Sequence, residues 1–241
     1  MTEPELELGQ RNLIGALDRI VTHLALAMVA AVATLFVAIV RPWRLAPLLS
    51  SDEPDGRDGV VLSPGAYLPL SLALVLLAAA AVTTPDTLQS NQGFLGPGLA
   101  VAVANAIAEG DVWKTLSIVL PIYAYAVCFG VLGRVLTPWA GAWWTLRTSL
   151  RAAFYQVATV VGWIVLSSAA IDAYRVASGN GDNWQLLYTL NTIPIVGLSL
   201  WMYFWFFRSG ESVSSLKAAA LTLGIFALMM AFFMLISELV F

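Results

Sequence analysis

The chain is divided into hydrophobic blocks of nearly uniform length, and this division limits what it can fold into. The stretch from Val21 to Val40 holds no charged residue, and comparable blocks recur five times downstream. Charged residues make up 11% of the chain, whereas about a quarter is usual for a soluble domain. About 20 apolar residues in a helix cross a bilayer core of about 30 Å, and a helix satisfies its own backbone in lipid. We therefore predict an all-α fold, built as a polytopic bundle of transmembrane helices.

Six hydrophobic segments are close to the length of one membrane span. They are Ile20–Val40, Ala66–Val82, Thr115–Leu136, Ala153–Tyr174, Leu186–Phe207 and Ala218–Phe241. The polar stretches between them are too short to fold independently. We therefore expect a single membrane-embedded domain over residues 1–241.

The first segment has two possible placements. Over residues 11–24, apolar residues recur at helical spacing, with Arg11, Asp18 and Arg19 on the other face. This pattern is typical of an amphipathic helix that lies at the membrane interface. The helix then runs into residues 25–40, which are apolar on every side and are able to insert. The chain is therefore predicted to have five or six spans.

The distribution of Lys and Arg orients the segments. Loops 41–65, 137–152 and 208–217, together with Arg134 beside the second of them, contain eight of the twelve basic residues. The other two loops and the tail contain two, and the head contains two. Because cytoplasmic loops carry an excess of Lys and Arg, we expect these three loops in the cytoplasm and the C-terminus outside. A cytoplasmic head, which goes with five spans, gives ten basic residues inside and two outside. An external head, which goes with six spans, gives eight inside and four outside, so five spans fit better.

Arginine and tryptophan gather at the ends of the segments on the predicted cytoplasmic side. The stretch Trp143–Arg151 is consistent with a helix resting on the cytoplasmic leaflet. Arginines near an anionic membrane surface contribute about 1 kcal/mol each to binding. The alternative is that these loops only anchor the topology. The residues that we predict to contact lipid or a partner are Arg41, Trp43, Arg44, Trp144, Arg147 and Arg151.

Two segments contain proline together with polar side chains. Proline leaves a backbone carbonyl one turn earlier without its helical donor, and another group must satisfy it. These residues are either ordinary kinks in a helical bundle or the lining of a small midplane pocket between the third and fifth segments. The residues of this alternative pocket are Pro121, Tyr123, Tyr125, Asn191 and Pro194.

The residue types needed for most enzyme chemistry are scarce. His23 is the only histidine and Cys128 the only cysteine, which leaves no second His or Cys at metal-ligand spacing. The chain contains neither a G-x-S-x-G elbow nor an H-E-x-x-H motif. We therefore expect no enzyme activity, no cofactor and no metal. The basic residues are scattered, so we expect no nucleic-acid partner.

Several short motifs resemble the Yip1-like superfamily of small integral membrane proteins. They are Arg41-Pro42-Trp43, Leu62–Tyr67, Glu109-Gly110-Asp111, Pro121 within its segment, and Leu146–Tyr155. The likeness extends over residues 12–240. It implies five spans after the Arg-Pro-aromatic turn, a cytoplasmic head and an external tail. Eukaryotic members are linked to vesicle trafficking through a long cytoplasmic head, which is short here, and prokaryotic relatives are mostly inner-membrane proteins.

The leading functional hypothesis is a non-enzymatic Yip1-like protein of a bacterial cytoplasmic (inner) membrane. It would organise lipid or protein partners through its cytoplasmic loops. The expected partners are membrane lipids, anionic ones included, and a membrane protein or a second copy of the chain. The alternative is a small transporter or channel that uses the midplane pocket. A subunit without activity of its own is a third possibility.

Overall fold

The computed structural model describes residues 3–50, 61–82, 112–141, 144–178, 184–210 and 213–240. Over these ranges the chain is helical and has no strand, so the prediction of an all-α fold is confirmed. The elements are α1 (Glu3–Val40), η1 (Pro42–Arg44), α2 (Ala46–Ser50), α3 (Pro64–Val82), α5 (Val112–Leu136), η2 (Thr137–Ala140), α6 (Leu146–Ala177), α7 (Trp184–Gly210) and α8 (Ser215–Val240).

The predicted leader and the first hydrophobic segment form one continuous helix, α1, of 38 residues. The helix ends at Val40 because the proline at position 42 disfavours helical geometry in the residue before it. Arg41 accordingly leaves the helical region, with φ −140° and ψ 57°. Its backbone N–H still donates to the carbonyl of Val37 at 2.8 Å. The chain then turns directly into η1 and α2.

The fourth segment begins earlier than its hydrophobicity indicates. Helix α6 starts at Leu146, seven residues before the predicted start at Ala153. Thr145 caps it, since its hydroxyl accepts a hydrogen bond from the backbone N–H of Thr148 at 3.1 Å. The stretch predicted to rest on the leaflet therefore includes the first turns of α6. Trp143 itself lies outside the described residues.

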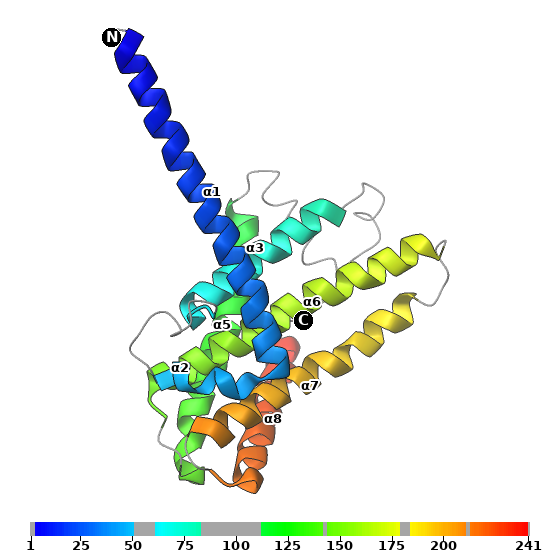
Figure 1. Ribbon diagram of the computed structural model, residues 1–241. Coiled ribbons are helices and arrows are strands. Elements are labelled where there is room, and N and C mark those ends of the chain that lie inside the picture. The colour runs from blue at the N-terminus through cyan, green and yellow to red at the C-terminus, as the bar shows by residue number, and fades with distance from the viewer. Residues whose placement is uncertain are drawn as a thin grey trace.

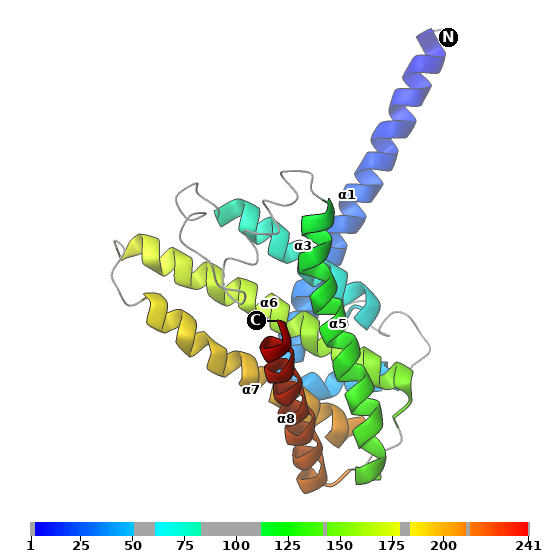
Figure 2. The ribbon, with the colours of Figure 1, turned by 180° about the vertical axis from the view of Figure 1, so that it is seen from behind.

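Helix α6 lies at the centre of the bundle (Figure 1). It contacts α1, α2, α3, α5 and α7. Helices α6 and α7 run side by side, and α8 lies beside both α7 and α5, as seen from behind in Figure 2. The N-terminal part of α1 extends away from this body (Figure 1). Helices α5 and α7 both pack on α6, and they meet each other where Phe129 stacks on Tyr203, with ring centroids 5.6 Å apart.

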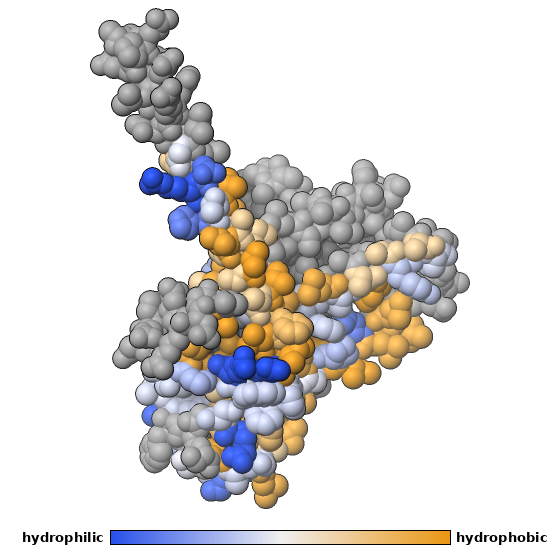
Figure 3. Space-filling model, in the orientation of Figure 1, coloured by the Kyte–Doolittle hydropathy of each residue, from blue (hydrophilic) through white to orange (hydrophobic). Residues whose placement is uncertain are grey.

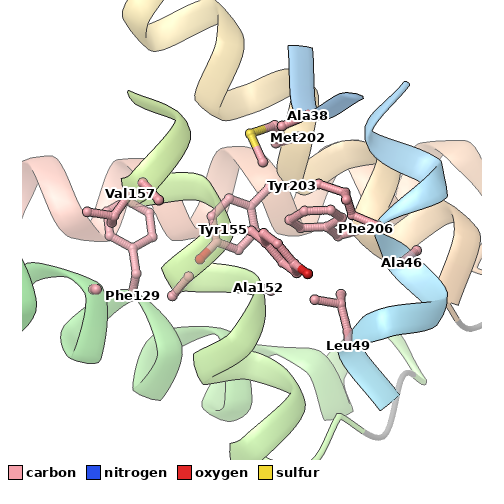
Figure 4. Close-up of a cluster of buried hydrophobic side chains, with 14 of the residues drawn as sticks. Ala38, Ala46, Leu49, Phe129, Ala152, Tyr155, Val157, Met202, Tyr203 and Phe206 are labelled. Carbon is pink, nitrogen blue, oxygen red and sulfur yellow. The ribbon is translucent and has the colours of Figure 1, made fainter. Parts of the chain in front are cut away.

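The core occupies one end of the bundle. Buried side chains come from the C-terminal halves of α1, α5 and α7 and from the N-terminal halves of α3, α6 and α8. They recur at helical spacing within residues 31–38, 64–71, 126–133, 149–162, 199–207 and 218–229. Figure 4 shows part of this cluster, where α1, α2, α5, α6 and α7 meet. On α1, α6 and α7 the described side chains beyond this zone are half-buried or exposed.

Glycine allows the close crossing of α5 and α6. A Cβ at Gly130 would lie 2.6 Å from Cδ2 and 3.0 Å from Cα of Leu150. A Cβ at Gly133 would collide with the hydroxyl of Ser149. Small residues that let helix backbones approach are typical of helix pairs in membranes. These two glycines thus fix how closely the third and fourth predicted segments approach each other.

The described surface carries large apolar side chains over much of its area. They include Ile20, Leu24, Val29 and Phe36 on α1, and Leu186, Leu190 and Ile193 on α7. Figure 3 shows this apolar surface along the lower part of α1 and over the ends of α6 and α7. Two described segments, Asp18–Val40 and Leu120–Trp139, are long and apolar enough to cross a membrane. Only 22% and 28% of their most apolar stretches are buried, so neither is a core helix enclosed by the rest of the fold.

Candidate functional site

The three loops predicted to be cytoplasmic meet at the end of the bundle that contains the core. Trp144, just before α6, stacks on Phe207 near the end of α7, with ring centroids 4.5 Å apart. Arg208 donates to the carbonyl of Val213 at 3.3 Å, across the turn into α8. Element η1 of the first loop contacts α7 as well. We take this end as the candidate contact surface and call it the loop end.

One face of α6 holds the first loop in place. The guanidinium of Arg151 donates to the carbonyls of Leu48 and Leu49, each at 3.3 Å, in the last turn of α2. One turn later, the hydroxyl of Tyr155 donates to the carbonyl of Leu62 at 2.7 Å. A cation at the C-terminal end of a helix stabilises the carbonyls that lack helical donors. Arg151 therefore connects α6 to the C-terminal end of α2 in the first loop.

The predicted lipid contacts separate into two groups. Trp144 is 2% exposed and packs in the core, so the prediction that it contacts lipid or a partner is wrong. It is buried because the chain entering α6 folds back over the aromatic end of α7. Arg151 is half-buried against α2, whereas Arg147, on the same helix, is exposed. Arg41, Trp43 and Arg44 are exposed as well.

A row of tryptophan rings, in tilted and edge-on contact, lies beside Arg41 and Arg44. The ring of Trp43 is 5.0 Å from that of Trp205, which is in turn 5.5 Å from that of Trp201. The indole N–H of Trp201 donates to the carbonyl of Ile39 at 3.2 Å, in the last turn of α1. We call Arg41, Trp43, Arg44, Trp201 and Trp205 the Trp–Arg patch.

The residues predicted from the sequence as contacts do not include Trp201 and Trp205. The signal that could have included them is their spacing of four residues, followed three residues later by Arg208. This spacing puts all three side chains near one face of a helix. Nothing in the spacing indicates that the face packs against the Arg-Pro-Trp turn.

The residues of the alternative midplane pocket do not share a neighbourhood. Tyr123 packs edge-on against Phe154 of α6, with centroids 6.4 Å apart, and Tyr125 packs against Phe129 of its own helix. Pro121 and Pro194 are exposed within helices that continue past them. The side chain of Asn191 forms its hydrogen bonds with residues of α6, not of α5.

Asn191 belongs to a polar cluster between α6 and α7. Its side-chain oxygen accepts a hydrogen bond from the indole N–H of Trp163 at 3.2 Å, and its nitrogen donates to the hydroxyl of Ser167 at 2.7 Å. Nearer the core, the side-chain nitrogen of Gln156 donates to the hydroxyl of Ser199 at 2.9 Å. Such bonds hold helices together where lipid offers no competing partner.

No family model matches the chain, and no similar protein is found among curated proteins or solved structures. The functional argument therefore depends on the geometry of the loop end and of the exposed apolar surface.

Proposed function

We propose that the chain is an integral membrane protein in which α1, α3, α5, α6, α7 and α8 each cross the bilayer. The observation that carries the proposal is the pair of tryptophans on α5 and η2. Trp113 is 81% exposed and Trp139 is 86% exposed. The 26 residue steps between them correspond to a rise of about 39 Å, close to the thickness of a bilayer with its interfaces. Tryptophan is enriched at both membrane interfaces.

The proposal includes α1 as a sixth span. Its segment Asp18–Val40 has a mean hydropathy of 2.5, against 1.5 for Leu120–Trp139. The C-terminal half of α1 is packed in the core, where Thr34 and Leu35 are buried. A helix of this hydropathy that enters the bundle is better placed across the membrane than along its surface. The head then lies outside with the C-terminus, and the loop end faces the cytoplasm.

Within the membrane, the protein has a non-enzymatic role in this proposal: it organises lipid or protein partners at its loop end. A relation to the Yip1-like superfamily is part of the proposal, and α3, α5, α6, α7 and α8 correspond to the five spans that follow the Arg41-Pro42-Trp43 turn. The external head departs from the cytoplasmic head that the resemblance implies. No observation favours a transporter or channel as a second candidate, because Asn191 bonds to Trp163 and Ser167 of α6 and Tyr123 packs against Phe154 of α6 instead of lining a common pocket.

Cysteine accessibility in intact and permeabilised cells tests the topology. Single cysteines are introduced into a variant in which Cys128 is replaced by serine. A reagent that does not cross the membrane is expected to label positions 5, 90, 180 and 241 in intact cells, and position 55 only after permeabilisation. Labelling of position 55 in intact cells would contradict the orientation. Protection of position 5 would remove α1 from the set of spans.

A further inference from the structure

We infer that the Trp–Arg patch binds the headgroup of an anionic phospholipid. The inference rests on the proposed function, since it needs the loop end at the level of the headgroups, and it narrows the predicted contact surface to one part of that end. Three indole rings form its apolar part and two guanidinium groups its charged part. Arginine suits phosphate because its donors match two oxygens at once.

The guanidinium groups of Arg41 and Arg44 are available to a phosphate from outside the protein. The backbone carbonyls near them already accept hydrogen bonds from other donors. At the end of α1, the carbonyl of Val37 accepts from the backbone N–H of Arg41, and that of Ile39 accepts from Trp201. In η1, the carbonyl of Arg41 accepts from the backbone N–H of Arg44. The described residues supply no hydrogen bond or ion pair to either guanidinium group.

The tryptophans give the patch a fixed shape. Trp43 is 37% exposed and Trp201 is 40% exposed, so each presents part of its ring while another part packs against Trp205. Tryptophan prefers the membrane interface because its ring is apolar and its N–H is polar. The rings would pack against the glycerol and upper acyl region of a lipid while Arg41 and Arg44 reach its phosphate.

Other basic residues of the loop end differ from this pair. Arg151 donates to the carbonyls of α2, and Arg208 donates to Val213. Arg147 is exposed in the first turns of α6. In the patch, the exposed Arg41 and Arg44 occur together with the partly exposed Trp43 and Trp201.

Native mass spectrometry of the detergent-solubilised full chain tests the inference, with phosphatidylglycerol as the probe and phosphatidylcholine as the uncharged control. The variant combines Arg41→Gln with Arg44→Gln. If each arginine contributes about 1 kcal/mol, the affinity for phosphatidylglycerol falls about 30-fold. Binding of phosphatidylcholine should stay unchanged, and the single variant Arg19→Gln, at an exposed arginine of α1 away from the loop end, should bind both lipids like the wild type.

Additional variants keep the test independent of folding and of topology. The variant that combines Arg41→Lys with Arg44→Lys retains the charge but not the paired donors and should recover part of the affinity, and Trp43→Ala should lower the affinity at unchanged charge. Unchanged phosphatidylglycerol binding by the glutamine variant would overturn the inference. So would an equal loss of both lipids, or displacement of the lipid by glycerol 3-phosphate. Because binding is measured in detergent, its failure is distinguishable from a failed topology.

Discussion

The crossing of α5 and α6 predicts a specific cost for one added methyl group. In Gly130→Ala, the new Cβ would meet Leu150 at 2.6 Å from a side-chain carbon and 3.0 Å from Cα, whereas ordinary contacts between carbon atoms lie at 3.5 to 4.0 Å. The side chain of Leu150 can rotate, but its Cα moves only if the helices separate. Overpacking of this kind costs about 1 to 3 kcal/mol.

A matched variant separates this cost from the general effect of alanine. Gly197 lies within α7, and a Cβ there would have nothing within 4 Å. Both substitutions raise the free energy of unfolding by up to about 1 kcal/mol from helix propensity alone, because alanine has a higher helix propensity than glycine. The difference in unfolding free energy between Gly130→Ala and Gly197→Ala therefore isolates the clash, and we expect it to be about 1 to 3 kcal/mol.

The assay is unfolding of the purified protein in mixed micelles, followed by tryptophan fluorescence as denaturing detergent is added. Gly197→Ala is expected to unfold at or above the wild-type midpoint, and Gly130→Ala below that of Gly197→Ala. Equal midpoints for the two variants would show that α5 and α6 do not cross as closely as described.

Three other substitutions test the polar contacts by the same measurement. Arg151→Gln loses two bonds to carbonyls and should cost about 1.5 to 3 kcal/mol, whereas Arg44→Gln, at an exposed arginine, should change stability by less than about 0.5 kcal/mol; equal effects would contradict the assigned role of Arg151. Tyr155→Phe removes the bond to Leu62 and should cost about 1 kcal/mol, so a neutral result would count against that bond. Asn191→Leu should cost about 1 kcal/mol, and a more stable variant would refute the α6–α7 cluster.

Hydrophobicity predicted which stretches are helical but not which faces are buried. Predicted segments and observed helices agree within a few residues for α3, α5, α7 and α8. In a bundle of this kind, side chains that face the core and side chains that face lipid are both apolar. The pattern of α1 between residues 25 and 40 therefore does not show that Thr34 and Leu35 are buried while Phe36 is exposed.

The candidate contact surface was predicted in part, and its errors come from contacts between distant segments. Trp43 and Trp144 are both loop tryptophans near arginines, yet only Trp43 is exposed. The difference arises because Trp144 meets Phe207 in the core, whereas Trp43 meets Trp205 at the edge of the core. Neither pairing can be deduced from local composition.

The concentration of the core at one end has a consequence for how the sequence can vary. Near the loop end the buried side chains of several helices form one packed cluster, so a change of volume there disturbs the fold. Toward the other end, described residues of α1 and α7 such as Val29 and Ile193 are exposed, and almost any apolar side chain would serve. Saturation mutagenesis should therefore find a gradient of tolerance along each helix. Homologues, once aligned, should conserve side-chain volume at the loop end and only hydrophobicity at the other.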